Sequence, residues 1–196
     1  MAEYKLLKVS RSTGVLRIAI DHPPVNVLNM ATMTEIGKAL DSLDPSVKVV
    51  VLSGQGRCFS AGVDIGEHRR DNVGKMLPLF HSMFRKMANL PQITIASVHG
   101  STLGGGCELA IFCDLVIAAE SARLGQPEIK LASFPPVSAI LLPRLIGRKK
   151  ALELLLIGDA IDAREAHRLG LVNQVVPDDQ LEAATTALVN KLASCS

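Results

Sequence analysis

The chain has 196 residues, of which 48% are hydrophobic and 20% are charged. This is the length and composition of one globular domain with enough apolar residues for a core, and it excludes a chain that is disordered over most of its length. Lys and Arg number 21 against 19 Asp and Glu, for a net charge of +2, and aromatic residues make up only 3%. Nucleic-acid-binding proteins use clustered cations and stacked aromatic rings, so the composition argues against that class.

The spacing of cysteine and histidine indicates neither a disulfide framework nor a metal centre. The cysteines are Cys58, Cys107, Cys113 and Cys195. No two of them form a C-x-x-C pair, and the histidines lack the short spacing of paired metal ligands, so we expect reduced thiols and no metal. The N-terminus has no apolar signal segment, and no apolar run approaches the ~20 residues of a membrane span. We therefore expect a cytoplasmic protein that binds no membrane.

The first part of the chain alternates predicted strands with predicted helices. Two β-rich runs, Tyr4–Ser10 and Gly14–Ile20, are separated by turn residues 11–13 and predict a hairpin. A proline pair then interrupts regular structure, and Asn29–Leu43 is typical of a helix. The next run, Val47–Leu52, is nearly all apolar, which indicates a strand buried on both faces of a parallel sheet.

The alternation continues and then gives way to helices. A helix over Lys75–Asn89 leads to a strand over Ile93–Val98. A helix that begins at Gly104 leads to a further strand over Asp114–Ala118. Four more helices are predicted, over Val137–Ile146, Lys149–Ile157, Ala163–Leu169 and Asp178–Leu192. This order predicts an α/β fold with right-handed crossovers, with a core over residues 1–135 and a helical region over residues 136–196.

The last predicted helix carries an apolar stripe at helical spacing. The stripe is formed by Leu181, Ala184, Leu188 and Leu192. We expect at least half of the stripe to pack on its own domain, and the remainder to be covered by a neighbouring subunit or by further C-terminal residues.

Two glycine-rich segments follow predicted strands, and neither fits a nucleotide-binding fingerprint. Gly54-Gln55-Gly56 lacks the third glycine of the dinucleotide motif, because Phe59 stands there. Gly104-Gly105-Gly106 lacks the Gly-Lys-Ser/Thr of a phosphate-binding loop. Tight turns are the simpler interpretation of each segment. However, small residues after a strand also let backbone N–H groups approach a ligand, and two such groups would form an oxyanion hole.

Two glutamates follow these segments. Glu108 lies in the first turn of the glycine-opened helix, where the helix dipole alone accounts for an acid. Glu128 follows a proline, as a solvated loop acid would. If both carboxyl groups lie beside an oxyanion hole, they are suited to adding or removing water next to a carbonyl group.

Four short motifs occur in order along the chain. They are Phe59–Ile65 (FSAGVDI), residues 99–110 (HGSTLGGGCELA), Cys113-Asp114 and Gly125–Ile129 (GQPEI). Together, from about Leu16 to residues 170–173, the chain resembles the crotonase (enoyl-CoA hydratase/isomerase) family. The resemblance implies a spiral of ββα units with a helical C-terminal part. It also implies a coenzyme A thioester as substrate and no separate cofactor.

The resemblance further implies roles for individual residues. The family's two oxyanion amides correspond to Ala61 and Gly105. Its two hydratase glutamates correspond to Glu108, which would orient the water, and Glu128, which would protonate the α-carbon; the presence of both favours hydration. The residues that would border coenzyme A and the substrate are Val25, Val27, Ala61, Gly62, Val63, Asp64, Ile65, Gly104 and Gly105. Arg57 would either contact a phosphate or be exposed without a ligand role.

The segment after Glu128 departs from the family pattern. Many hydratases have a glycine-rich loop here, whereas this chain has Phe134-Pro135-Pro136, and Pro136 has no N–H to donate. Phe134 and Pro136 would form a bulky and stiff wall of the acyl pocket. In this respect the segment resembles the cyclohexa-1,5-diene-1-carbonyl-CoA hydratases of anaerobic aromatic degradation.

Chain length is a second departure, since family members continue for roughly 60 residues more, within the usual domain range. That part closes the acyl pocket and helps to form trimers, often stacked as hexamers. The resemblance therefore implies a homo-oligomer, a chain that is truncated here, and residues 136–196 as the start of the trimerisation part. Two alternatives stay open. One is isomerisation or another chemistry of the family, and the other is a non-catalytic protein of this fold that binds RNA, against which the charge and both glutamates argue.

Overall fold

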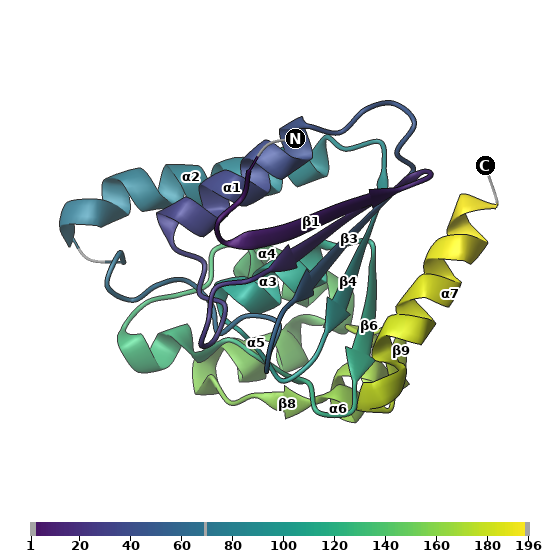
Figure 1. Ribbon diagram of the computed structural model, residues 1–196. Helices are drawn as coiled ribbons and strands as arrows, with labels where there is room; N and C mark the ends of the chain where they lie inside the picture. Colours follow the sequence, from purple (N-terminus) through teal and green to yellow (C-terminus); the bar gives the residue numbers. More distant parts are fainter. Residues whose placement is uncertain (1–2, 69, 195–196) are drawn as a thin grey trace.

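A six-stranded sheet forms the centre of the molecule (Figure 1). The computed structural model describes residues 3–68 and 70–194. The strands lie in the order β1-β2-β3-β4-β6-β9; β1 and β2 form an antiparallel hairpin, and all later neighbours are parallel. Their bounds are β1 Leu7–Ser12, β2 Val15–Ile20, β3 Val49–Gly54, β4 Ile93–Val98, β6 Leu115–Ala119 and β9 Gln174–Val176. The prediction of a largely parallel sheet is therefore confirmed.

A second sheet contains three short strands, β5 (Ser101–Leu103), β7 (Arg123–Gly125) and β8 (Ile161–Asp162). β4 is followed by β5, and β6 by β7, so each of these turns of the chain gives one strand to each sheet. A helix follows in both cases, α3 (Gly105–Phe112) after β5 and the 3-10 helix η1 (Pro127–Leu131) after β7. This repeat is the spiral of ββα units that the resemblance implies.

Helices cover both faces of the large sheet. α1 (Met30–Asp41) and α2 (Arg70–Ala88) lie together on one side, and α7 (Leu181–Ala193) lies on the other (Figure 1). In β3, Val50 and Leu52 belong to the main core, whereas Val49 and Val51 belong to a smaller core with Val189 of α7. Both faces of β3 are buried, which explains its unbroken apolar run. The remaining helices are α4 Ser138–Ile146, α5 Arg148–Ile157, α6 Ala163–Arg168 and the 3-10 helix η2 Asp178–Gln180.

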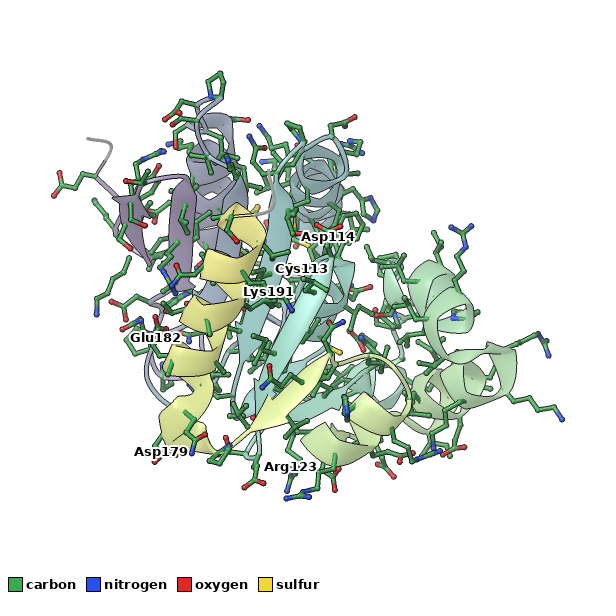
Figure 2. The ribbon with its side chains drawn as sticks, turned by 90° about the vertical axis from the view of Figure 1, so that its right-hand side faces the viewer. Cys113, Asp114, Arg123, Asp179, Glu182 and Lys191 are labelled. Carbon is green, nitrogen blue, oxygen red and sulfur yellow. The ribbon has the colours of Figure 1, made fainter. Side chains whose placement is uncertain are left out.

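α7 lies across the large sheet, and Figure 2 views the molecule from this side. Thr185 is fully buried, with its Oγ1 2.9 Å from Oγ of Ser97 in β4, and Arg17 of β2 pairs with Glu182 at 3.0 Å. The predicted apolar stripe is half-buried on its own domain, and no large apolar side chain of residues 181–193 is exposed. The stripe therefore packs in part on its own domain, as expected, and what covers the rest of its surface stays a prediction.

Several element boundaries differ from the prediction. β1 continues to Ser12, so the hairpin turn falls at Thr13-Gly14, where Gly14 has a φ of +73°. α2 begins earlier than the predicted start at Lys75. The prediction missed its first turn because most of the residues there are polar and do not show the apolar periodicity of the rest of the helix. The segment predicted as one helix from Asp178 is divided into η2 and α7.

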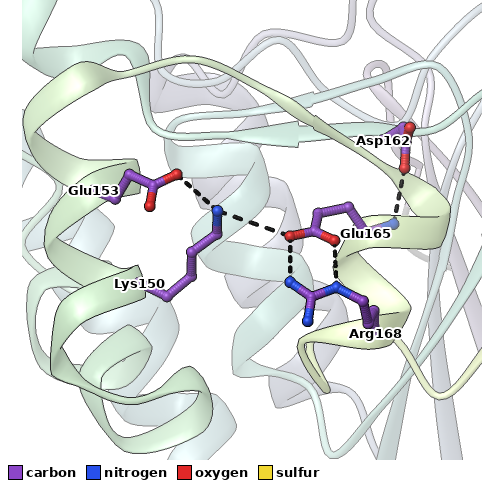
Figure 3. Close-up of polar contacts among 5 residues, drawn as sticks. All are labelled: Lys150, Glu153, Asp162, Glu165 and Arg168. Atoms are coloured by element: carbon purple, nitrogen blue, oxygen red, sulfur yellow. Dashed lines mark hydrogen bonds and ion pairs between the residues drawn. The ribbon is translucent and has the colours of Figure 1, made fainter.

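An ion pair between Lys150 and Glu165 joins α5 to α6 (Figure 3). Nζ of Lys150 lies 2.7 Å from Oε1 of Glu153 and 3.7 Å from Oε1 of Glu165. Glu165 accepts two hydrogen bonds from Arg168, which lower its carboxyl pKa, and its N–H donates to Asp162 at 2.8 Å. Ion pairs that are partly or fully exposed to solvent add little to stability.

The helical region shares the core of the rest of the chain. Leu142, Ala151 and Leu171 belong to the same buried cluster as the strands of the large sheet, and β8 and β9 also come from this region. The division at residue 135 stays a prediction. Within the ranges that the structure describes, no helix is both long enough and apolar enough to cross a membrane.

Candidate active site

A cavity of about 220 Å³ lies beside the N-terminus of α3. Its walls come from the loop over residues 61–68, from α2, from the start of α3, and from residues 127–136. The lining residues are Ala61, Gly62, Val63, Ile65, His68, Met76, Leu77, Phe80, Gly104, Gly105, Glu108, Pro127, Glu128, Leu131, Ser133, Phe134, Pro135 and Pro136. Most of them are apolar or glycine, and Glu108 and Glu128 are the carboxylic acids among them.

Glycines at the start of α3 leave space for the cavity. Gly104 has a φ of +51°, and a Cβ there would lie 2.8 Å from Oε1 of Glu128. A Cβ on Gly105 would lie 2.7 Å from Cγ2 of Val63. Any larger residue at these positions would displace Glu128 or the loop of Val63, which explains why both positions are occupied by glycine.

The geometry contradicts the oxyanion role predicted for Ala61. Its N–H donates to the carbonyl oxygen of Val25 at 2.9 Å, which ties the loop over residues 60–64 to the loop before α1. Gly62 has a φ of +104°, so the backbone turns between Ala61 and Val63. Ala61 lines the cavity, but its N–H is already paired and is not free to bind a substrate oxygen.

The N–H groups of Val63 and Gly105, unlike that of Ala61, are available to bind a ligand. Neither has an acceptor among the residues that the structure describes, and both residues line the cavity. They lie close together, since a Cβ on Gly62 would be 3.5 Å from the nitrogen of Gly105. Gly105 also opens α3, where the helix dipole adds partial positive charge. Two free donors from different segments at one place have the arrangement of an oxyanion hole.

Glu108 is a buried acid held by the start of α4. Its side chain is buried, at 1% exposure, and Oε1 accepts the N–H groups of Val137 at 2.7 Å and Ser138 at 2.9 Å. Burial raises the pKa of Glu108 to about 7; the nearby charge of Glu128 adds to this effect, and the two N–H groups oppose it. The carboxyl group can therefore gain or lose a proton near neutral pH.

Glu128 faces the same cavity from η1. Its Oε2 is buried and has no hydrogen-bond partner in the described part of the chain. Burial also raises the pKa of Glu128, and the N–H of its own backbone opposes the shift. A carboxyl oxygen that is buried without a partner favours the protonated form, which has a proton to donate.

Comparison with known proteins identifies the family. The family model described as enoyl-CoA hydratase/isomerase matches residues 10–196. The chain belongs to this family. A probable enoyl-CoA hydratase, echA8 of Mycobacterium tuberculosis, is 40% identical over 200 residues, which cover 98% of this chain and 78% of the relative. The cyclohexa-1,5-dienecarbonyl-CoA hydratase of Thauera aromatica is 34% identical over 177 residues, covering 89% and 69%. The crystal structure of the enoyl-CoA hydratase from Bacillus anthracis superposes with a TM-score of 0.93 at 35% identity, covering 97% and 77%.

Most of the residues predicted for this family's site do line the cavity, and three do not. Val25 does not line the cavity, and its carbonyl oxygen accepts a hydrogen bond from the N–H of Ala61. The carbonyl oxygen of Val27 faces Nδ1 of His22 at 3.1 Å, and Oδ1 of Asp64 accepts the N–H of Gly66 at 2.7 Å. The catalytic and coenzyme A roles of all these residues stay predictions.

The sequence did not predict the wall that α2 contributes. Met76 and Phe80 line the cavity at a spacing of one helical turn, which is also the spacing of a helix face that packs in the core. His68 and Ser133 were also missed, and their Nε2 and Oγ lie 3.4 Å apart at the cavity. Isolated polar residues in loops carry no periodic signal that could have identified them.

Other candidate groups lie away from this cavity. Arg57 is exposed and does not line it. Cys58, Cys107 and Cys113 are buried free thiols, whereas Cys195 lies outside the described residues. Across residues 3–68 and 70–194, no three His, Cys, Asp or Glu side chains are grouped so that they could hold a metal ion.

Proposed function

We propose that the chain is an enoyl-CoA hydratase, a carbon–oxygen lyase that adds water across the conjugated double bond of a coenzyme A thioester. The observation that carries the proposal is that the buried carboxyl group of Glu108, the half-buried carboxyl group of Glu128 and two unpaired N–H groups meet at one cavity. The name of the relative from Mycobacterium tuberculosis supports the same reaction. No cofactor is required, because coenzyme A is part of the substrate.

The unpaired N–H groups would bind the thioester carbonyl. Its oxygen accepts hydrogen bonds from Val63 and Gly105 and gains negative charge as the enolate forms. Because these donors are already fixed in place, they stabilise the charge without reorganisation during the reaction. Val63 takes the place that the resemblance assigned to Ala61, since the N–H of Ala61 is paired with Val25.

The two acids would then add water in a balanced sequence. Glu108, fixed by Val137 and Ser138, orients the water, whose oxygen bonds to the β-carbon while its proton passes to the carboxyl pair. Glu128, protonated at its unpartnered oxygen, gives a proton to the α-carbon. The carboxyl pair ends the reaction with the same number of protons as at the start.

The cavity wall favours a ring as the acyl group. Phe134, Pro135 and Pro136 line the cavity, and the prolines fix their own φ angles and restrict the residue before each. A stiff wall suits an alicyclic ring, which loses less entropy on binding than a flexible chain does. We therefore propose cyclohexa-1,5-diene-1-carbonyl-CoA as the substrate and a place in aromatic degradation, in agreement with the name of the Thauera aromatica relative.

Assays with crotonyl-CoA and cyclohexa-1,5-diene-1-carbonyl-CoA, followed by loss of the conjugated absorbance, test the proposal. We expect hydration of both, with kcat/KM at least about tenfold higher for the dienoyl thioester, equivalent to about 1.4 kcal/mol in the transition state. Equal kcat/KM values for the two thioesters would support ordinary enoyl-CoA hydration and contradict the proposed cyclic substrate. Movement of the double bond without water uptake would indicate an isomerase, and no turnover of either thioester would indicate a binding protein.

We also propose that the chain forms homo-oligomers, as trimers or dimers of trimers, and acts in the cytoplasm. Large apolar side chains are exposed on η1, α4 and α5, namely Ile129, Leu131, Ile140, Leu145, Leu156 and Ile157. Exposed apolar surface of this kind is typical of an interface, and most of it belongs to the region predicted to take part in assembly. A stable monomer by light scattering, without binding of a hydrophobic dye, would contradict this assembly.

A further inference from the structure

Ser138, the first residue of α4, connects the surroundings of the two acids. Its N–H donates to Oε1 of Glu108 at 2.9 Å, and its Oγ accepts from Nε2 of Gln126 at 2.6 Å. Ser138 is fully buried, and Gln126 is 1% exposed. Gln126 directly precedes η1, the helix that carries Glu128. One buried serine therefore links the support of Glu108 to the base of the helix that presents Glu128.

We propose that Ser138 is a positioning residue that holds the two acids in register, through the N–H that it donates to Glu108 and the hydroxyl that it offers to Gln126. The inference rests on the proposed function, since it assigns both carboxyl groups to one reaction. Ser138 is not among the residues that line the cavity, so it acts through its partners and not on the substrate.

Among the described residues, no other hydrogen bond joins the start of α4 to Gln126 or η1. Val137 precedes Ser138 and caps the helix with no side-chain hydrogen bond. The two residues before Val137 are prolines, which have no N–H to donate. A hydrogen bond between two buried groups is unfavourable to break, because each is left without a partner. Oε1 of Gln126 has no partner among the described residues, so its amide is held by the bond to Ser138 at 2.6 Å and by a contact with the Cys107 thiol.

Loss of the Ser138 hydroxyl would affect Glu108 indirectly, by changing the position of the backbone N–H groups that donate to it. Nε2 of Gln126 would lose its hydroxyl acceptor, and the start of α4 would lose its hydrogen bond to the residue before η1. The two N–H groups that stabilise ionised Glu108 would then be less well aligned. The pKa of Glu108, already raised by burial, would rise further, and fewer molecules would hold the carboxylate at pH 7. The resulting loss of activity should shrink as the pH increases.

Ser138→Ala is therefore expected to lower kcat at pH 7 by about 10- to 100-fold, with KM within about threefold. The acidic limb of its kcat profile should move to higher pH. Ser138→Thr keeps a hydroxyl and should recover most of kcat. Gln126→Leu should cause a loss similar to that of Ser138→Ala, and the double variant should be no worse than either, because both remove the same link.

Ser97→Ala is the matched control. It also removes a buried hydroxyl with a buried partner, Thr185 at 2.9 Å, and neither residue lines the cavity. This variant should lose thermal stability to a similar extent while keeping the kcat and the pH profile of the parent. If Ser138→Ala keeps the parent's pH profile, or loses no more kcat than Ser97→Ala, the proposal is overturned.

Titration of the glutamate carboxyl groups by carbon-13 NMR gives a readout that does not depend on turnover. The pKa of Glu108 should be higher in Ser138→Ala than in the parent. If the parent hydrates no enoyl thioester but this shift is present, the proposed function fails while the link between Ser138 and Glu108 stands. If the parent is active but the pKa of Glu108 is the same in Ser138→Ala as in the parent, the positioning role of Ser138 is excluded while the proposed function stands.

Discussion

Replacing Glu108 by glutamine is expected to lower kcat by at least about 100-fold and, at the same time, to stabilise the fold above neutral pH. Burial raises the pKa of Glu108 from 4.5 to about 7, so between these values the folded state binds the proton more tightly than the unfolded chain does. Stability is therefore lost as the pH rises through this window. At about 1.4 kcal/mol for each pKa unit, the ionised carboxylate costs about 3 kcal/mol above pH 7 and almost nothing below pH 4.5.

Urea unfolding at pH 5 and pH 8 measures this effect. Gln has the shape of Glu, and its amide oxygen can still accept the N–H groups of Val137 and Ser138 while no charge is buried. The stability of Glu108→Gln relative to the parent should therefore increase by about 2.5 kcal/mol between the two pH values. Glu153→Gln, at an exposed acid of α5, is the control, and its relative stability should change by less than about 0.5 kcal/mol.

Two results would refute the reasoning. A relative stability of Glu108→Gln that does not change with pH would mean that the folded state leaves the carboxyl pKa near its ordinary value. A variant that is less stable than the parent at pH 8 would mean that the hydrogen bonds of the anion outweigh the penalty of burial. In the same samples, kcat should fall by at least about 100-fold, the usual scale of a positioned acid or base.

Three further substitutions test the site. Glu128→Gln should lower kcat at least about 100-fold with little change in KM, since backbone N–H groups bind the thioester; turnover near that of the parent would exclude Glu128 from the reaction. Gly104→Ala should lower kcat by more than Gly56→Ala does, because both positions have positive φ but only a Cβ at Gly104 would meet Glu128, at 2.8 Å. Equal effects would mean that backbone strain alone matters. Exchanging Pro135-Pro136 for two glycines should narrow the preference for the cyclic thioester in kcat/KM, and an unchanged ratio would show that the prolines do not set specificity.

Most of the large sheet could be predicted from sequence because its signal is local and strong, whereas β9, with three residues, was not predicted. The run Val49–Leu52 is apolar at every position, as a strand covered on both faces must be. The small sheet could not be predicted in this way. β5 and β7 have three residues each and β8 has two, which is too short for an alternating pattern. These strands exist because distant segments pair with one another, and such pairing leaves no trace in a single short segment.

The cavity was only partly predictable for a related reason. The motifs identified the glycines and acids around α3, because unusual residues at fixed spacing are specific. They did not identify Met76 and Phe80, since an apolar helix face has the same sequence pattern whether it meets a core or a cavity. They also did not show that the N–H groups following Pro136, those of Val137 and Ser138, would be directed at Glu108. A proline pair that removes backbone donors thus precedes the two donors on which that acid depends.

The error at Ala61 shows how one backbone angle can move a functional group between neighbouring residues. In a regular strand, the N–H groups of residues 61 and 63 would point to the same side, and either would be an acceptable donor. Gly62 has a φ of +104°, a value that glycine adopts readily, and it breaks this regularity. The N–H of Ala61 therefore meets the carbonyl oxygen of Val25, while that of Val63 stays unpaired beside Gly105. The sequence identifies the glycine, but only the path of the chain decides which neighbour presents its amide to the cavity.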